Sequence, residues 1–199
     1  MKSYQFRGAA PYYTNSFMLI SEKNNAVIID PAANAADYQE VLRKEGATLV
    51  AILCTHGHFD HITGAMTLRE ETGATLYCNP EDARGNQMFP LPYADKGLAE
   101  GEIIAVDELS FKVFHTPGHS EGSVCLLCGD YFFTGDTLFC GSIGRTDFEG
   151  SDPYKMLESL RKLVALALPG ETHILPGHEQ FSTYAHELAT NWHLQNGCR

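Results

Sequence analysis

Four side chains that commonly bind metals lie within six residues of one another, in the sequence THGHFDH. They are His56, His58, Asp60 and His61. Three imidazoles and a carboxylate suit borderline metals such as zinc, iron or manganese. Because alternate residues of an extended segment point the same way, His56 and His58 are predicted to hold one ion. Asp60 and His61, at the turn into a helix, are predicted to face a second ion beside it.

Three more candidate ligands follow apolar runs later in the chain, in HTPGHS, FTGDTLF and ILPGH. Loops that follow strands gather at one edge of a sheet, so we expect these side chains to meet the first motif. The predicted ligands of one ion are His56, His58 and His119. The predicted ligands of the other are Asp60, His61 and His178. Asp136, which has two carboxylate oxygens, is predicted to bridge them, and each ion keeps a position for water, as a catalytic site needs.

Strands and helices that could position these ligands occur in two successive blocks. The first block is predicted to contain the strands Ser16–Ser21, Ala26–Asp30 and Thr48–Cys54 and the helices Asn34–Glu45 and Ile62–Glu71. The second is predicted to contain the strands Leu109–His115, Ser123–Cys128, Tyr131–Thr134 and Thr172–Leu175, a helix opened by Asp152 and Pro153, and a last helix Gln180–Gln195. This order favours an α/β fold in which two packed sheets have helices outside. We expect a single domain over residues 1–199, because no linker or repeat interrupts the pattern.

The chain is acidic, with a net charge of -11 from 14 basic and 25 acidic residues. Nucleic acid is not expected as a partner, because phosphate binding needs clustered Lys and Arg. No apolar run approaches the roughly 18 residues of a membrane span, and the first residues lack the apolar core of a signal peptide. We therefore expect a cytoplasmic protein that does not enter the membrane. Nothing in the sequence indicates its oligomeric state.

Six cysteines are present, and two of them, Cys125 and Cys128, form a C-x-x-C pattern. A redox or zinc-binding C-x-x-C normally lies on a loop or at the start of a helix. These two lie in a predicted strand, where residues three apart point to opposite faces. We therefore expect a structural role for this pair, and free thiols throughout the chain.

The motif T-H-x-H-x-D-H and the ligands that follow it resemble the metallo-β-lactamase superfamily of hydrolases over nearly the whole chain. The resemblance implies a four-layer αββα sandwich of two mixed β-sheets with this ligand set. The segments TPGHSEGSVCLL, GDTLFCGSIGRTDF and ILPGH are similar to type II glyoxalases, especially the shorter bacterial members. That similarity implies hydrolysis of S-lactoylglutathione to lactate and glutathione. Zinc is the metal we expect first, with iron or manganese as alternatives.

Two features depart from the type II glyoxalases. The long members carry a C-terminal helical domain that contributes to glutathione binding, whereas one helix and a tail follow His178 here. The usual Gly after the last ligand of the short members is Glu179 in this chain. Hydrolysis is therefore predicted more firmly than glutathione as part of the substrate.

The expected mechanism uses a hydroxide that bridges two metal ions and attacks a thioester carbonyl. Asp60 is predicted to accept a hydrogen bond from this hydroxide and to aim it. Arg145 resembles the basic position after the glycines in type II glyoxalases and is predicted to bind a substrate carboxylate, since a guanidinium forms two parallel hydrogen bonds with it. A salt bridge between Arg145 and Asp147 is the alternative.

Other functions share this metal core, and each would use a small-molecule substrate. Persulfide dioxygenases resemble the chain, carry a similar GRTDF-like loop and bind a single iron through two His and one Asp. Lactonases and other thioesterases use the same paired-metal core. Both remain alternatives to a glutathione thioester hydrolase.

Overall fold

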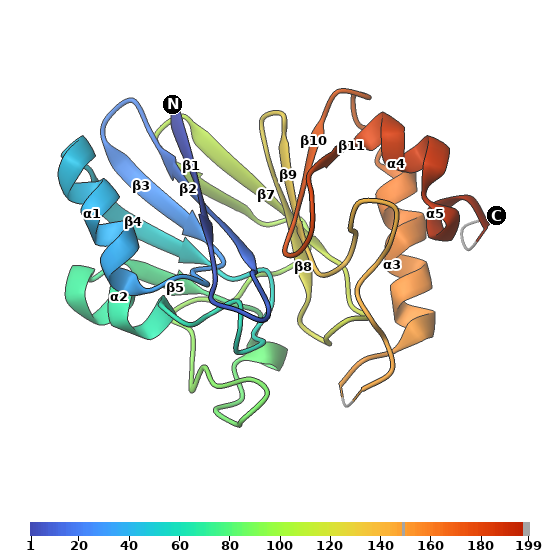
Figure 1. Cartoon of the computed structure of the whole chain (residues 1–199), viewed down its shortest axis with the longest axis horizontal. Coiled ribbons are helices and arrows are strands. Elements are labelled where there is room, and N and C mark those ends of the chain that lie inside the picture. The colour runs from blue at the N-terminus through green and yellow to red at the C-terminus, as the bar shows by residue number, and fades with distance from the viewer. Residues whose placement is uncertain (149, 197–199) are drawn as a thin grey trace.

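The computed structural model of the chain describes residues 1–148 and 150–196. Two β-sheets pack face to face, with helices on both outer faces (Figure 1), as the sequence predicted. The first sheet has the order β1 (Lys2–Arg7), β2 (Asn15–Ile20), β3 (Asn25–Ile29), β4 (Thr48–Leu53) and β5 (Thr75–Tyr77). The second has the order β11 (Ser182–Thr183), β10 (His173–Pro176), β9 (Tyr131–Gly135), β8 (Val124–Cys128), β7 (Leu109–His115) and β6 (Ile103–Val106).

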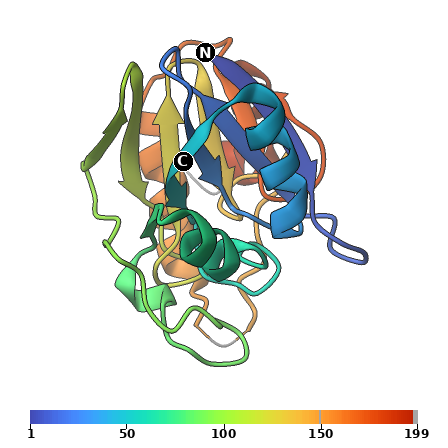
Figure 2. The same cartoon turned by 90° about the vertical axis from the view of Figure 1, so that its left-hand side faces the viewer.

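The helices divide between the two outer faces, and together with the sheets they form an αββα sandwich (Figures 1 and 2). The first sheet is covered by α1 (Ala35–Glu45) and α2 (Ala65–Thr72), and the second by α3 (Pro153–Ala165), α4 (Tyr184–Thr190) and α5 (Trp192–Asn196). Both sheets are mixed, because β3 pairs in parallel with β4, and β9 in parallel with β10, among antiparallel neighbours.

Local signals in the sequence explain where several elements begin and end. Asp152 accepts hydrogen bonds from the backbone N–H groups of Tyr154 and Lys155, and Pro153 occupies the first helical position of α3. Gly46 ends α1 with a φ of 61°, a conformation that side chains with a Cβ rarely adopt. Both boundaries agree with the sequence prediction.

The apolar side chains form three layers that hold the sandwich together. Between the sheets, Leu53 and Phe111 belong to one buried cluster. Behind the first sheet, Ile52 packs in a second cluster with residues of α1 and α2. Behind the second sheet, Leu160 of α3 packs in a third. Consecutive residues of β4 therefore enter different layers, as expected for a strand that is buried on both faces.

Cys125 and Cys128 separate in the same way, because Cys125 packs toward α3 and Cys128 lies between the sheets. The structure thus confirms the structural interpretation of the C-x-x-C pattern. The described cysteines Cys54, Cys78, Cys125, Cys128 and Cys140 are free, and Cys198 lies outside the described residues. Within the described part of the chain, no helix has the length and hydropathy needed to cross a bilayer.

The predicted helix Gln180–Gln195 is wrong in its extent. The segment instead holds β11, α4 and α5, with an extended Asn191 between the two helices. Asn191 Nδ2 donates to the carbonyl of Ser142 and to Glu187 Oε2, and Gly141 N donates to the same carboxylate oxygen. These contacts hold the loop after β9 and stop the helix at this point. The edge strand β1 was not predicted, because only Tyr4 and Phe6 of its residues are apolar and neither is fully buried.

Truncating the buried Ile52 tests the layered core. Ile52→Ala removes a fully buried side chain, and we expect the free energy of unfolding of the metal-loaded protein to fall by roughly 2–5 kcal/mol in chemical denaturation. Ile103→Ala is the matched control, because Ile103 is 60% exposed and its loss should change stability by about 0.5 kcal/mol or less. Equal destabilisation by the two substitutions would contradict the assignment of Ile52 to the core.

Candidate metal centre

The seven predicted ligands come together at one edge of the sandwich. They lie in the loops that follow β4, β7, β9 and β10. The first loop supplies four of them from THGHFDH, and the other three loops supply His119, Asp136 and His178. Both sheets therefore contribute, and the centre forms where their strand ends meet.

His56, His58 and His119 form the first group, and their ligand atoms lie within 4.8 Å of one another. All three side chains are buried. His58 Nδ1 lies 2.9 Å from His119 Nε2. Two imidazole nitrogens that both present lone pairs repel each other at this distance, so the arrangement requires a cation or a proton between the rings.

Asp60, His61 and His178 form the second group, again with ligand atoms within 4.8 Å of one another. His61 Nε2 lies 3.3 Å from His178 Nε2, and Asp60 Oδ2 lies 3.3 Å from the same atom of His178. Thr14 Oγ1 donates a hydrogen bond of 2.8 Å to Asp60 Oδ2 and fixes that carboxylate. The second group is less deeply buried than the first, since the side chain of His178 is 22% exposed.

Asp136 lies between the two groups. Its Oδ2 is 3.3 Å from His119 Nε2 of the first group and 3.5 Å from His178 Nε2 of the second. Its Oδ1 is 3.3 Å from His61 Nε2. The geometry therefore places a buried carboxylate in reach of both halves of the site, where a bridging ligand would have to be.

Three of the histidines are oriented by hydrogen bonds on the side of the ring away from the centre. His119 Nδ1 donates to the carbonyl of Arg145 at 3.0 Å, and His178 Nδ1 donates to the carbonyl of Tyr12 at 3.1 Å. A carbonyl oxygen can only accept, so Nδ1 carries a proton, and Nε2 is the atom that would bind a metal after losing any proton of its own. His61 Nδ1 is held in the same manner by Asp30 Oδ2, at 3.1 Å.

Three buried polar atoms of the site have no hydrogen-bond partner among the described residues. They are His56 Nε2, His58 Nε2 and Asp136 Oδ1. A buried polar atom without a partner costs roughly 1–3 kcal/mol. Neutral imidazoles and carboxylates around such atoms are the donor set that zinc, iron and manganese accept, so the residues present fit a pair of divalent ions.

The electrostatic environment favours ligand-competent forms of His56 and His58 and of both carboxylates. Burial lowers the pKa of His56 well below its usual range, and burial with the neighbouring His119 lowers the pKa of His58 to about 3. Burial opposes the ionised form of Asp60, but the hydrogen bond with His178 and the charge of His61 lower its pKa to about 2. Burial also opposes the ionised form of Asp136, but the charges of His61 and His119 outweigh burial and hold the pKa of Asp136 well below its usual range.

The pKa of His61 shifts in the opposite direction to those of His56 and His58. Burial lowers its pKa, but the charges of Asp136 and Asp30 outweigh burial and raise the pKa well above the usual value. A metal ion at this position therefore competes with a proton for the same nitrogen, and metal binding releases that proton.

Asp30 supports the centre and was not among the predicted site residues. It follows β3 directly, its two oxygens accept hydrogen bonds of 2.6 Å from the backbone N–H and the hydroxyl of Thr55, and Oδ2 also faces His61. Thr55 immediately precedes the ligand motif, so Asp30 ties β3 to the start of the site. The strand-end rule that found Asp136 could have found Asp30, which ends a predicted strand beside β4.

Asp82 is a second supporting carboxylate that the sequence analysis missed. It ends a short 3-10 helix (Pro80–Asp82) and is fully buried. It accepts hydrogen bonds from Gly57 N at 3.1 Å, from Gly122 N at 2.9 Å and from Ser120 Oγ at 2.6 Å. Gly57 and Ser120 each adjoin ligands, so Asp82 joins the loop after β4 to the loop after β7. No local pattern could have shown this contact.

Arg145 lies beside the centre, but its side chain points to a surface ion pair. Its Nε donates to Asp147 Oδ1 at 2.7 Å and its Nη2 to Asp147 Oδ2 at 3.2 Å, and both side chains are about 70% exposed. The salt bridge considered as an alternative is therefore present. The backbone carbonyl of Arg145, rather than its guanidinium, contacts a ligand, His119.

Comparisons with known proteins agree with this fold. The family model described as metallo-beta-lactamase superfamily matches residues 9–178. The chain is 32% identical to the hydroxyacylglutathione hydrolase GloC of Haemophilus influenzae over 199 residues, which covers 90% of this chain and 92% of that protein.

Three similar solved structures are each 32% identical to this chain. The BLEG-1 B3 metallo-beta-lactamase has a TM-score of 0.88 and covers 98% of this chain and 100% of its own. ETHE1 from Myxococcus xanthus has a TM-score of 0.85, and the match covers 98% of this chain and 84% of ETHE1. TTHA1623 in a di-iron-bound form has a TM-score of 0.80, and the match covers 95% of this chain and 98% of TTHA1623.

Removing the metals should destabilise the fold, because the buried groups of the centre then lose their partner. A ligand that binds the folded state at about one hundred times its Kd adds roughly 2.7 kcal/mol. For a domain of this size we expect chelation to lower the Tm by about 5–10 °C in differential scanning calorimetry. Re-addition of zinc should restore the Tm, and an unchanged Tm on chelation would contradict metal binding at this cluster.

Asp82→Ala tests the link between the two ligand loops. The substitution leaves the buried N–H groups of Gly57 and Gly122 without an acceptor. We expect the affinity for metal to fall by roughly tenfold, as is usual when a residue that supports the metal ligands is lost. Affinity is measured by competition with a chromophoric chelator. Asp82→Asn, which keeps one acceptor oxygen, should fall between wild type and Asp82→Ala, and the exposed Asp37→Ala is the matched control. Wild-type affinity in Asp82→Ala would show that the link is not needed.

Proposed function

The chain belongs to the metallo-beta-lactamase superfamily, and we propose that it is a two-metal hydrolase of small acylated thiols such as S-lactoylglutathione. The observation that carries this proposal is the position of Asp136, within 3.5 Å of histidines from both ligand groups. Such a carboxylate suits two ions rather than one. The similarity to a hydroxyacylglutathione hydrolase supports the thioester as the bond that is cleaved.

The two ion positions follow the two groups of side chains. One ion would be held by His56, His58 and His119. The other would be held by Asp60, His61 and His178, with Asp136 shared between them. When bound, two divalent ions supply a water of lowered pKa and stabilise negative charge on oxygen and sulfur. Zinc is the first candidate, and the donor set also accepts iron or manganese, in keeping with the di-iron form of TTHA1623.

Asp60 is the residue of the chain that we assign to positioning the attacking water. The hydrogen bond from Thr14 Oγ1 holds its carboxylate in place and favours the ionised form. An ionised carboxylate accepts a hydrogen bond from water and directs the lone pair of the water oxygen toward the carbonyl carbon. The new C–O bond forms, the C–S bond breaks, and the thiol leaves with the proton that the water releases.

Aromatic rings beside the ligands limit the access of bulk water. The rings of Phe89 and Phe148 lie 4.7 and 5.3 Å from that of His58, between ring centroids, and Phe139 lies 5.9 Å from that of His178. Apolar walls strengthen the electrostatic interactions within the site, because they lower the local dielectric constant.

A persulfide dioxygenase with a single iron is the second candidate function. The observation that favours it is the structural similarity to ETHE1. ETHE1 and GloC are each 32% identical to this chain. A single iron would use fewer of the seven side chains. Lactonases and other thioesterases would use both ions, and they differ from the first proposal only in the substrate.

Metal content and turnover in one preparation separate these functions. We expect about two metal ions per chain by elemental analysis and hydrolysis of S-lactoylglutathione that His58→Ala and Asp136→Ala reduce by at least 100-fold, since outer-shell partners alone account for 10–100-fold. His173→Ala, on β10 outside the ligand set, is the matched control and should keep wild-type turnover.

Two other results of this experiment would indicate a different function or a different substrate. One iron per chain, with oxygen consumption on glutathione persulfide, would overturn the hydrolase in favour of the dioxygenase. Two metals without thioesterase turnover would contradict the thioester substrate and direct the assay to lactones.

A further inference from the structure

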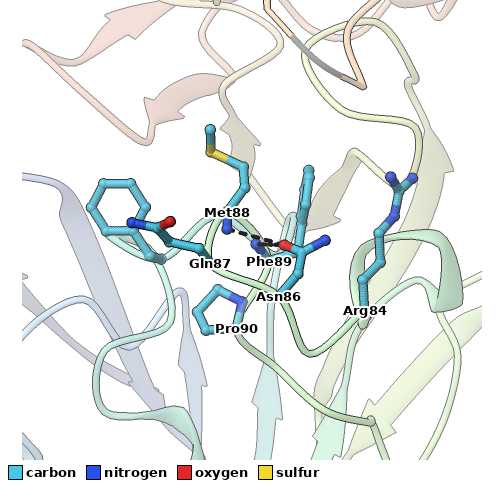
Figure 3. Close-up of a pocket in the computed structure, with 7 residues that line it drawn as sticks. Arg84, Asn86, Gln87, Met88, Phe89 and Pro90 are labelled. Carbon is cyan, nitrogen blue, oxygen red and sulfur yellow. Dashed lines mark hydrogen bonds between the residues drawn. The ribbon is translucent and has the colours of Figure 1, made fainter.

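A cavity of about 850 Å³ opens beside the metal centre. It is lined by Arg84, by the loop of residues 86–90 and by Phe59 (Figure 3). The cavity adjoins the first ligand group, because the ring of Phe89 packs 4.7 Å from that of His58 and Phe59 immediately follows His58 in the chain. A molecule that reacts at the centre can therefore extend into this space.

Hydrogen bonds within the loop give the cavity a defined wall. Asn86 Oδ1 accepts from the backbone N–H groups of Met88 and Phe89, at 3.0 and 2.8 Å (Figure 3). Gly85 N donates to the carbonyl of Leu91 at 2.8 Å and closes the loop at its base. Phe89 is thereby buried against His58, while Met88 remains 40% exposed and has apolar surface available for contact.

Arg84 is the one charged residue among the described residues that line the cavity. Its guanidinium lies over the ring of Phe89, 4.9 Å from the centroid, and its Nε donates to the carbonyl of Glu81. Among the described residues, the carboxylate that pairs with it is that of Glu121, whose Oε2 is 3.7 Å from Nη2, and Glu121 pairs more closely with Lys155, at 2.9 Å. Within residues 1–148 and 150–196, the terminal nitrogens of Arg84 therefore have no carboxylate within hydrogen-bonding distance, and the contact to Glu121 is a longer ion pair.

Arg145 offers a direct contrast. Its guanidinium lies 5.4 Å from the ring of Phe148, which packs on the other side of His58. However, Arg145 already forms two hydrogen bonds with Asp147. An incoming carboxylate would have to displace Asp147 from Arg145, whereas at Arg84 it would meet donors that are not closely paired.

We propose that this cavity binds the thiol portion of the substrate, and that Arg84 binds a carboxylate of that portion. The methylene groups between the carboxylate and the sulfur would pack on Phe89 and Met88, so the predicted substrate class is a thioester of an acidic, flexible thiol. The proposal deepens the proposed function and rests on it for the position of the reacting bond. Arg84 therefore determines specificity without taking part in bond cleavage.

Two thioesters that differ in charge test this assignment. S-lactoylglutathione carries carboxylates on its thiol portion, whereas S-lactoyl-N-acetylcysteamine has the same acyl group and none. For Arg84→Gln we expect a KM for the first substrate about tenfold above wild type, since a lost hydrogen bond to a charged group has this size, with kcat within about twofold. The KM for the neutral thioester should not change. Arg84→Lys, which keeps the charge, should recover part of the loss.

Arg43→Gln is the matched control and should keep both KM values, because in the described part of the chain the side chain of Arg43 donates its hydrogen bond to its own helix, α1. A similar KM change for both substrates in Arg84→Gln, or no change for either, would overturn the assignment. A larger change in Arg145→Gln than in Arg84→Gln would also overturn it.

Calorimetric binding of S-methylglutathione to the metal-loaded protein separates this proposal from the proposed function. The thioether cannot be hydrolysed, and we expect its Kd to rise about tenfold in Arg84→Gln. If that rise occurs in a protein that hydrolyses no thioester, the cavity assignment stands and the proposed function fails. If wild type hydrolyses S-lactoylglutathione but Arg84→Gln binds S-methylglutathione as well as wild type does, only the cavity assignment fails. If wild type does not bind S-methylglutathione, the cavity assignment is also overturned.

Discussion

A buried carboxylate surrounded by imidazoles is the constraint on which the rest of this structure depends. Asp136 lies within 3.5 Å of His61, His119 and His178, in a region that largely excludes water. A buried carboxylate next to imidazole lone pairs is unfavourable unless a cation binds between them, because removing an ion from water costs several kcal/mol even after relaxation. Metal binding is therefore coupled to the stability of the fold as well as to chemistry.

The sandwich meets this constraint by ending four strands at one edge. The strands β4, β7, β9 and β10 each lead into a loop that carries one or more of the ligands. Asp30 and Asp82 then fix these loops from behind through short hydrogen bonds to Thr55 and Ser120. The same edge leaves room for the cavity under residues 86–90, so the reacting centre and the space that selects the substrate share the wall formed by Phe89.

Local and distant contacts explain how much the sequence could predict. The seven ligands carry a distinct spacing and follow apolar strands, so their meeting point and the two sheets were predictable from the pattern. Asp82 and Arg84 have no such signal, because their roles arise from contacts with loops far along the chain. The break in the predicted helix Gln180–Gln195 depends likewise on Asn191 bonding to Ser142. The strand β1 carries only a short apolar alternation, Tyr4 and Phe6, which is too little to identify a strand in a sequence.

Anomalous scattering from crystals of the metal-loaded protein, measured at the absorption edge of the bound metal, tests the central claim most directly. The account predicts two peaks per chain, one among His56, His58 and His119 and one among Asp60, His61 and His178, with Asp136 between them. A single peak confined to one group, or peaks at a different part of the surface, would contradict a paired-metal centre.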